Sequence, residues 1–244
     1  MGEGFRTAFR MKASCERVTG FRFDKPEGYD FAPGQYFMLN LETAEGSQRK
    51  PFSHASAPRD PFIEMATRLT GSAFKNALDS LVRGDEVRIE GPYGRLLLPD
   101  GVDHACFLSG GVGITPARSI IRDAEQRRSG LRIRLFDGNH DQGCIPYSGE
   151  FAEYAEKDRR FRVVHVLEEP FPGWAGERGF ITADLVRRHL DPLGRWHYFV
   201  SGPPAMVTAM EGVLEELAVP RERWSVESFA GYGERELPPA SLGT

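Results

Sequence analysis

The change of pattern after Pro99 constrains the fold of this chain most strongly. Beyond this point, short apolar runs alternate with segments of helical periodicity. The expected strands are 105–108, 131–136, 161–167, 196–201 and 224–229, and the expected helices are 116–128, 151–155, one that begins after Thr182, and 204–217. Parallel strands need crossover connections, so this alternation predicts a doubly wound parallel sheet of the α/β class. We expect Thr115 to cap the first helix, with Pro116 in its first turn and Gly130 past its end.

The first hundred residues follow a different pattern. Short apolar runs such as Tyr36–Leu41 and Glu86–Glu90 are separated by turns rich in glycine and proline, which predicts a β-barrel or a β-sandwich. One short helix is expected around Phe74, ended by Gly84. The predicted domains are therefore residues 1–98 and 99–232, followed by a flexible tail at 233–244.

Composition argues against several classes of function. The formal net charge of −4 gives no general attraction to nucleic acid or to an anionic membrane. Residues 1–12 lack the apolar core of a signal peptide and no run reaches transmembrane length, so we expect a cytoplasmic protein, which we take to be a monomer. Three scattered cysteines and six histidines predict no disulfide framework, no iron–sulfur cluster and no metal site.

The segment Leu108-Ser-Gly-Gly-Val-Gly-Ile-Thr-Pro116 carries the strongest chemical signal. A strand ends here, Gly110, Gly111 and Gly113 form a tight turn, and a helix begins. Glycines let a pyrophosphate approach the backbone, and the helix start offers unpaired N–H groups and a partial positive charge. The pattern favours a nucleotide-binding loop over the alternative, a purely structural strand–helix turn.

A second loop, Ser201-Gly-Pro-Pro-Ala-Met206, also joins a strand to a helix. In a doubly wound sheet the carboxyl ends of the strands form one rim, where ligands bind. The two loops together could hold both ends of a dinucleotide, although this loop alone is more typical of an ordinary tight turn.

In the first domain, Lys50-Pro-Phe-Ser53 combines a cation, an aromatic ring and a hydroxyl. These groups can serve one flavin, because the cation neutralises a phosphate, the ring covers the isoalloxazine and the hydroxyl bonds a ring heteroatom. On a strand, Lys50 and Phe52 face one side and Ser53 the other. The alternative is an unremarkable edge strand. The adjacent His54 could be an acid–base group, but a strand residue that points away from the ring is the favoured interpretation.

Together, and in this order, the three motifs resemble the ferredoxin–NADP reductase-like family of flavoprotein reductases. The resemblance covers about residues 5–232 and includes Pro33-Gly-Gln-Tyr36, Gly84-Asp-Glu-Val87 and Gly91-Pro-Tyr-Gly94. It implies an antiparallel six-stranded Greek-key β-barrel that binds FAD. It also implies a following α/β doubly wound parallel sheet of five strands that binds NADH or NADPH.

The resemblance also implies roles for single residues. Ser53 would bond near the flavin N5, Ser201 and Glu227 would border the nicotinamide, and Phe229 would shield the flavin ring until nicotinamide displaces it. The implied FAD-binding residues are Lys50, Pro51, Phe52, Ser53, Met65, Ala66, Thr67, Gly71, Ala73, Phe74 and Lys75. The implied nicotinamide-nucleotide residues are Gly110, Gly111, Val112, Gly113, Thr115, Pro116, Gly202, Pro203, Pro204 and Met206.

Two residues depart from the family pattern. Lys50 replaces an arginine, keeping the charge but losing the bidentate fork, so that either flavin binds more weakly or Arg49 substitutes. Ser201 replaces a cysteine and keeps a small polar contact. This second change should slow hydride transfer at most, because the thiol is not consumed in the reaction.

The choice between NADH and NADPH depends on the residues that follow the expected strand 131–136. Asp137 follows this strand, where an acid that binds the ribose often lies. The segment Asp137-Gly-Asn-His140 lacks the Ser/Arg pair expected of a 2′-phosphate site, which favours NADH. Arg118 and Arg159 are arginines from elsewhere in the chain that could reach the ribose after folding.

The predicted activity is hydride transfer from NADH or NADPH to bound FAD, with the electrons passed to a separate acceptor. A ferredoxin or an oxygenase component is one kind of acceptor, and free flavin or ferric iron is the alternative. A different hypothesis is a non-catalytic nucleotide-sensing module that keeps the same fold.

Overall fold

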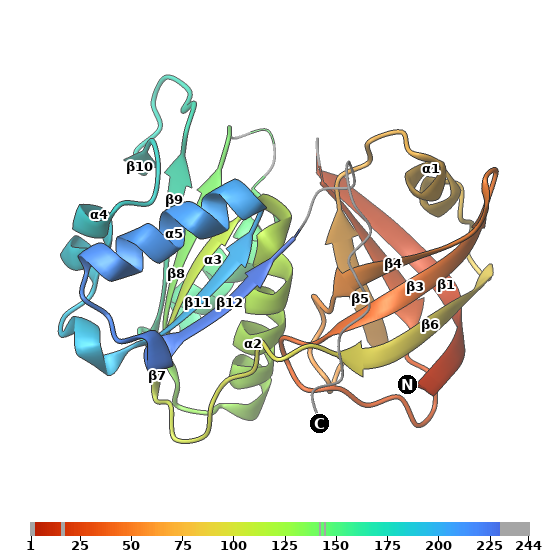
Figure 1. Cartoon of the computed structure of the whole chain (residues 1–244), viewed down its shortest axis with the longest axis horizontal. Coiled ribbons are helices and arrows are strands. Elements are labelled where there is room, and N and C mark those ends of the chain that lie inside the picture. Colours follow the sequence, from red (N-terminus) through yellow and green to blue (C-terminus); the bar gives the residue numbers. More distant parts are fainter. Residues whose placement is uncertain (1–2, 16–17, 142, 144, 230–244) are drawn as a thin grey trace.

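The computed structural model describes residues 3–15, 18–141, 143 and 145–229 of the 244-residue chain. The predicted tail at 233–244 and the last residues of the second predicted domain lie outside the described residues. The chain forms two lobes side by side, an antiparallel barrel and a layered α/β domain (Figure 1). No helix among the described residues is long and apolar enough to cross a membrane.

The first lobe confirms the predicted antiparallel six-stranded class. Its elements are β1 (Glu3–Cys15), β2 (Val18–Asp24), β3 (Tyr36–Thr43), β4 (Gly46–Ser53), β5 (Phe62–Thr67), α1 (Ala73–Asp79) and β6 (Glu86–Tyr93). The strand order is β4-β3-β6-β1-β2-β5, so β6 returns between β3 and β1 in the manner of a Greek key. The two edge strands approach each other where Ala55 N donates to Glu64 O at 2.7 Å.

Alternation of apolar and polar residues gives this lobe its interior. In β3, Phe37, Leu39 and Leu41 are buried, and the residues between them are more exposed. Their side chains meet those of the other strands and of α1 in one core. The helix α1 ends at Asp79, before the predicted stop at Gly84, and Ser72 caps its start by accepting from Lys75 N at 3.4 Å.

The second lobe confirms the predicted parallel α/β class. Its elements are β7 (His104–Gly110), α2 (Ile114–Arg127), β8 (Arg132–Asn139), α3 (Ser148–Lys157), β9 (Phe161–Leu167), β10 (Glu177–Arg178), α4 (Ala183–His189), β11 (His197–Gly202), α5 (Pro204–Glu216) and β12 (Trp224–Ser228). All strands are parallel in the order β10-β9-β8-β7-β11-β12. Helices α4 and α5 pack on one face of the sheet, and α2 and α3 pack on the other, where α2 lies next to the barrel (Figure 1).

Three expectations from the sequence, on the number of strands, a helix cap and the cysteines, were wrong. The parallel sheet has six strands rather than five, because the two-residue β10 pairs with β9. Thr115 is not the helix cap: a 3₁₀ turn at Gly111–Gly113 begins the winding directly after β7, and the Thr115 hydroxyl donates to Val112 O at 3.0 Å inside the helix. Cys15 is disulfide-bonded, which the spacing of the cysteines along the chain did not indicate.

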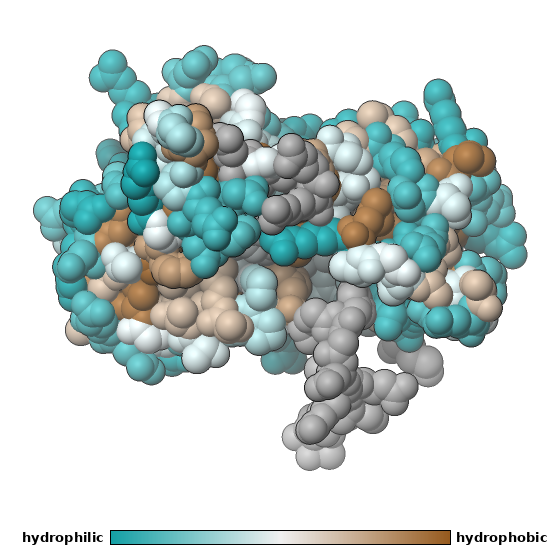
Figure 2. Space-filling view, turned by 90° about the horizontal axis from the view of Figure 1, so that it is seen from above, coloured by the Kyte–Doolittle hydropathy of each residue, from teal (hydrophilic) through white to brown (hydrophobic). Residues whose placement is uncertain are grey.

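The described residues expose few large hydrophobic side chains. Figure 2 shows a face covered mainly by hydrophilic residues, with hydrophobic residues in small separate groups. Among the described residues, the large hydrophobic side chains that are exposed are Met11, Leu69, Val82 and Phe180. Scattered residues of this kind are normal on a protein surface.

His54 belongs to the barrel core. Its ring stacks on Phe31 with centroids 3.7 Å apart, while Nδ1 lies 2.7 Å from Gln35 O and Nε2 lies 2.9 Å from the Tyr29 hydroxyl. Burial lowers the pKa of His54 from 6.5 to about 3. The structure therefore supports the interpretation of His54 as a structural residue over an acid–base role.

We predict that His54 makes the barrel sensitive to acid. The unfolded chain takes up a proton at His54 below about pH 6.5 and the folded protein does not, so its contribution is complete above that pH and is lost as pH falls toward 3. The loss should reach up to about 4 kcal/mol. Denaturant unfolding of His54→Gln at pH 7.5 and pH 4.5 should show a smaller decline than the parent. His189→Gln, at the end of α4, should decline like the parent, and equal declines for all three proteins would contradict the prediction.

Candidate active site

The two glycine loops of the sheet lie directly against each other, at the carboxyl ends of β7 and β11. A Cβ atom at Gly113 would lie 2.2 Å from Ser201 O, and one at Gly110 would lie 2.1 Å from the Met206 sulfur. The backbone leaves no room for a side chain at Gly113, and one at Gly110 would have to displace Met206. The structure therefore brings together the two loops that the sequence predicted to hold one dinucleotide.

Ser201 links these two loops. Its side chain is fully buried, and its hydroxyl donates to Gly113 O at 2.8 Å and lies 3.3 Å from the Ser109 hydroxyl. In this structure the hydroxyl therefore serves the contact between the loops. Its expected place beside the nicotinamide stays a prediction.

On the barrel, Ser53 shares one face with two aromatic residues. Tyr36 lies opposite Ser53 in the β3–β4 pair and opposite Tyr93 in the β3–β6 pair, and the two tyrosine rings are 5.6 Å apart. Ser53 Oγ is buried and has no hydrogen-bond partner among the described residues. Phe52 points to the other side, into the barrel core, where it contacts Phe37 and Phe74.

Glu227 approaches this face from the other lobe. It lies beside Ser201 in the β11–β12 register, and its Oε2 is buried without a hydrogen-bond partner among the described residues. Burial raises the pKa of the Glu227 carboxyl from 4.5 to about 7. The pKa of Tyr36 is also raised, first by its own burial and then by the Glu227 charge, so the two side chains are close.

Phe229 continues from the same strand. Its backbone N–H donates to Gly202 O at 2.9 Å, which holds the end of the described chain against the second glycine loop. Of the four predicted catalytic residues, Ser53 and Glu227 lie near Tyr36 and come from different lobes. Ser201 lies near the end of β11, opposite Glu227, and Phe229 directly follows β12.

Two lysines lie together at the edge of the barrel. The Lys75 ammonium group donates to the Thr67 hydroxyl and lies 4.7 Å from the centre of the Phe52 ring. Burial, and then the charge of Lys50, lower the pKa of Lys75 to about 8. Two ammonium groups within electrostatic reach of each other favour an anion such as phosphate between them.

The remaining predicted residues fall into three groups. Buried in the barrel or in the first turn of α2 are Met65, Ala66, Phe74, Thr115 and Pro116. At the surface or half-buried near α1 and β4 are Pro51, Gly71 and Ala73. On the rim formed by the two glycine loops are Gly111, Val112, Gly202, Pro203, Pro204 and Met206.

The expectation that Asp137 lies at the end of its strand, where it could bind the ribose, was wrong. Strand β8 continues to Asn139, so Asp137 lies inside the strand and is fully buried. Its Oδ2 is 3.0 Å from His165 Nδ1 on the neighbouring strand. Beyond β8 the rim carries His140 instead, whose Nδ1 lies 2.9 Å from Glu168 and whose Nε2 lies 3.6 Å from Glu169.

The two arginines considered for the ribose do not reach it. Arg118 is buried between the lobes, and Arg159 precedes β9 at the opposite rim of the sheet. Arg68 follows β5, and the resemblance implied a place for it along the flavin but not its approach to the first glycine loop. Its Nη2 lies 3.1 Å from where a Cβ of Gly111 would be, so a barrel arginine reaches the first glycine loop. Its place directly after the Met65–Thr67 segment was the available signal.

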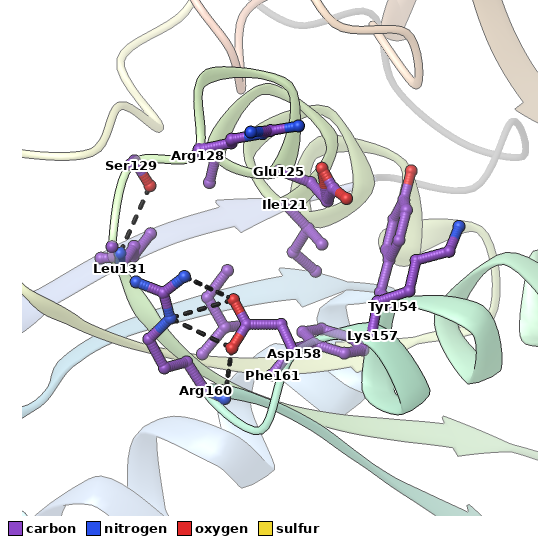
Figure 3. A pocket seen from close by; sticks show the side chains of 13 residues that line it. Ile121, Glu125, Arg128, Ser129, Leu131, Tyr154, Lys157, Asp158, Arg160 and Phe161 are labelled. Carbon is purple, nitrogen blue, oxygen red and sulfur yellow. Dashed lines mark hydrogen bonds and ion pairs between the residues drawn. The ribbon is translucent and has the colours of Figure 1, made fainter.

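The pocket shown in Figure 3 lies away from these loops. It has a volume of about 340 Å³ and is lined by the end of α2, the end of α3 and the amino ends of β8 and β9. Arg160 pairs there with Asp158 at 2.7 Å. We assign it no part in the site, because the parallel sheet binds its ligands at the other rim.

Comparison with known proteins places the chain among reductases. The family described as oxidoreductase NAD-binding domain matches residues 107–212. The reductase component of propane 2-monooxygenase from Mycolicibacterium goodii is 30% identical over 214 residues, which cover 84% of this chain and 61% of that protein. NADH-cytochrome b5 reductase 1 from Emericella nidulans is 31% identical over 222 residues, which cover 84% of this chain and 71% of that protein.

The fold also matches a solved structure with both cofactors. The ferredoxin NADP+ reductase from Neisseria gonorrhoeae with bound FAD and NADP superposes with a TM-score of 0.80 at 20% identity, covering 93% of this chain and 99% of that one. At this identity the match shows the fold alone. The chain spans about 61% of the length of the propane 2-monooxygenase reductase components that it matches.

We predict that Glu227 destabilises the protein at neutral pH. A raised pKa means that the folded state holds the proton more tightly than the unfolded state, so stability is highest below about pH 4.5 and is lost as pH rises through 7. Glu227→Gln removes the titration and should gain about 2–3 kcal/mol relative to the parent between pH 5 and pH 8. Thermal unfolding of both proteins without added nucleotide measures the difference. Glu211→Gln, on α5, is the control, and a constant difference between parent and Glu227→Gln across this range would refute the prediction.

Proposed function

Since this chain belongs to the ferredoxin reductase-like family of FAD- and NAD(P)-binding flavoprotein reductases, we propose that it oxidises NADH through a bound FAD and passes the electrons to a separate protein. FAD binds to the barrel, residues 1–98, and the nicotinamide nucleotide to residues 99–232. The cofactors supply the hydride acceptor and donor, and the protein supplies binding, orientation and electrostatics.

One observation carries this proposal. Two buried polar atoms without hydrogen-bond partners among the described residues, Ser53 Oγ and Glu227 Oε2, belong to different lobes, and both residues lie near Tyr36. Buried polar groups are nearly always hydrogen-bonded in native proteins. A flavin ring that lies against Tyr36 and Tyr93 would offer partners to Ser53, and the nicotinamide amide would offer one to Glu227.

The barrel residues fit the phosphate end of the same ligand. Lys50 and Lys75 bring two positive charges near each other, and a phosphate would be attracted to both. The pyrophosphate of the nicotinamide nucleotide would occupy the first glycine loop, where Arg68 adds a cation. In this arrangement Ser53 orients the flavin and the contact between the loops at Gly113 and Ser201 orients the nicotinamide.

The acceptor is proposed from the relatives. A reductase component of propane 2-monooxygenase and one of phenol 2-monooxygenase match 84% and 88% of this chain. We therefore propose that the electrons go to an oxygenase component, directly or through an iron–sulfur protein.

Anaerobic reduction tests the proposal. The purified protein should be yellow, release FAD on heating, as identified by mass spectrometry, and lose its colour when NADH is added. Release of FMN alone would refute the assignment of FAD. A colourless protein that neither binds flavin nor oxidises NADH would favour the nucleotide-sensing module instead.

We predict that Lys50→Ala weakens FAD binding far more than Lys50→Arg does. A charge-assisted hydrogen bond to phosphate contributes roughly 1.5–3 kcal/mol, so its loss should weaken affinity about tenfold or more. Arg49→Ala tests the alternative, because Arg49 lies on the other face of β4, where it pairs with Glu90 at 3.1 Å and lies 3.5 Å from the Tyr93 hydroxyl. FAD titration of the flavin-free protein measures all three. A larger effect of Arg49→Ala would show that Arg49 holds the phosphate.

The preference for NADH follows from charge at the rim. Glu168 and Glu169 directly follow β9. They lie beside His140, which directly follows β8. Hydrogen bonding to Glu168 and the charge of Glu169 raise the pKa of His140. The two carboxylates outnumber this one partly charged imidazole, so a 2′-phosphate bound here would be repelled.

We predict a higher kcat/KM for NADH than for NADPH, and a smaller preference in Glu169→Arg. The substitution removes a negative charge and adds a guanidinium that binds phosphate, so kcat/KM for NADPH should rise about tenfold. Glu125→Arg, at the opposite rim, makes the same change of charge and should alter neither value. Steady-state rates with one acceptor at fixed ionic strength measure the preference, and a parent that favours NADPH would contradict it.

A further inference from the structure

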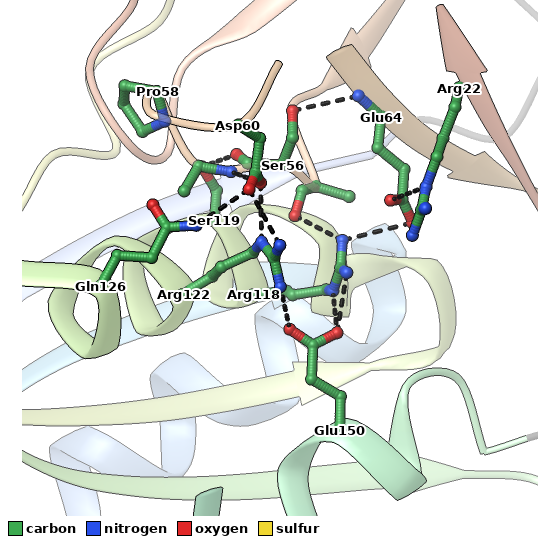
Figure 4. Close-up of polar contacts among 12 residues, drawn as sticks. Arg22, Ser56, Pro58, Asp60, Glu64, Arg118, Ser119, Arg122, Gln126 and Glu150 are labelled. Carbon is green, nitrogen blue, oxygen red and sulfur yellow. Dashed lines mark hydrogen bonds and ion pairs between the residues drawn. The ribbon is translucent and has the colours of Figure 1, made fainter. Parts of the chain in front are cut away.

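A network of buried charges joins the two lobes along helix α2. Arg118, Arg122 and Gln126 lie on one face of this helix at intervals of four residues, and Ser119 lies beside them (Figure 4). Such a face would normally be apolar or in contact with water. Here the helix face is polar and is packed against the barrel, so its polar residues do not serve solubility.

The barrel supplies acids and carbonyl groups to this face. Arg122 binds Asp60 with two nitrogens, at 2.6 and 2.8 Å, and Gln126 donates to the same carboxylate at 2.8 Å. Arg118 donates to Ala55 O at 2.7 Å and lies 3.2 Å from Glu64. Ser119 donates to Ser56 O at 2.7 Å.

A third element completes the network. Glu150, on α3, accepts from Arg118 at 2.7 and 2.8 Å with one oxygen and from Arg122 at 3.0 Å with the other. Glu64 also pairs with Arg22 on β2 at 2.7 Å. Three carboxylates thus face three guanidinium groups, and Arg118, Asp60 and Glu64 are almost entirely buried.

These contacts hold the two segments that carry predicted cofactor-binding residues, namely the segment after Ser53 and the first glycine loop. Ala55 and Ser56 lie two and three residues after Ser53 in the chain, and their carbonyl groups accept hydrogen bonds from α2. The same helix begins at the first glycine loop, so Arg118 lies only five residues after Gly113. The distance between Ser53 and that loop is therefore determined by bonds to one short, regular element.

We propose that Arg118, Ser119 and Arg122 are positioning residues that fix the angle and distance between the flavin-binding edge of the barrel and the nucleotide loop. The inference rests on the proposed function and adds to it the part that aligns the two cofactors. Hydride transfer depends steeply on alignment, since a displacement of about 1 Å can slow a reaction about a hundredfold.

The chemistry of the contact suits this role better than a stabilising one. Buried ion pairs contribute little net stability compared with apolar packing, because the charges lose their hydration. They do fix direction, since a guanidinium group that binds both carboxylate oxygens allows one orientation only. An apolar interface of the same size would let the lobes slide, because hydrophobic contact has no direction.

The test uses the full-length protein loaded with FAD and two mild substitutions. Arg122→Lys keeps the charge but loses the two-pronged contact with Asp60, and Ser119→Ala removes one hydrogen bond. Arg187→Lys is the matched control, because Arg187 makes exposed pairs with Asp184 and Glu216. Single-turnover bleaching at saturating NADH gives the rate of hydride transfer. FAD content, NAD+ affinity and calorimetric unfolding are measured on the same samples.

We expect Arg122→Lys to transfer hydride about 10–100-fold more slowly than the parent, with FAD content and NAD+ affinity unchanged. Ser119→Ala should show a smaller loss and Arg187→Lys none. Calorimetric unfolding of Arg122→Lys should resemble that of the parent, because the contact contributes orientation rather than net stability. Hydride-transfer rates equal to the parent's in both α2 variants would overturn the inference and leave the proposed function intact. A slower rate that is explained by lower FAD content or weaker NAD+ affinity would do the same. A parent that NADH does not bleach overturns the proposed function itself.

Discussion

The pairing of Arg118 and Arg122 with acids from three elements is the interaction on which the arrangement of this molecule depends. Each lobe has its own large apolar core, and among the described residues only a small cluster around Val18, Ala66, Val112 and Tyr147 spans the two. The relative placement of the lobes must therefore come from the contact between them. That contact is made largely by charged and hydroxyl groups on α2, whose short bonds leave little freedom of angle (Figure 4).

Much of the fold could be predicted because local signals and tertiary packing agree. The apolar run at 161–167 is strand β9 to the residue, and Thr182 caps α4 by accepting from Leu185 N at 3.2 Å, as expected. The start of α5 at Pro204 also agrees. In each case the periodicity of the segment and the residue at its end point to the same structure.

Other features depended on partners distant in the chain. The pairing of Arg122 with Asp60 joins residues 62 apart, and polar residues in a helix and a loop are usually in contact with water. The burial of Asp137 escaped prediction for the same reason, since its strand is extended by neighbours on both sides. At the site, alternation along β4 correctly separated Phe52 from Ser53, but the approach of Glu227 required the register of β12 on β11.

The ionic nature of the contact between the lobes has a consequence for the newly made chain. The barrel leaves the ribosome first, and α2 follows some sixty residues after Asp60. During that interval the carboxylates of Asp60 and Glu64 face water. They hydrate readily, and they repel the same carboxylates on other newly made chains. An apolar surface at the same place would attract neighbouring chains until its partner arrived. This polar surface thus limits aggregation of the newly made barrel before α2 is synthesised, and it later binds α2 in the complete fold.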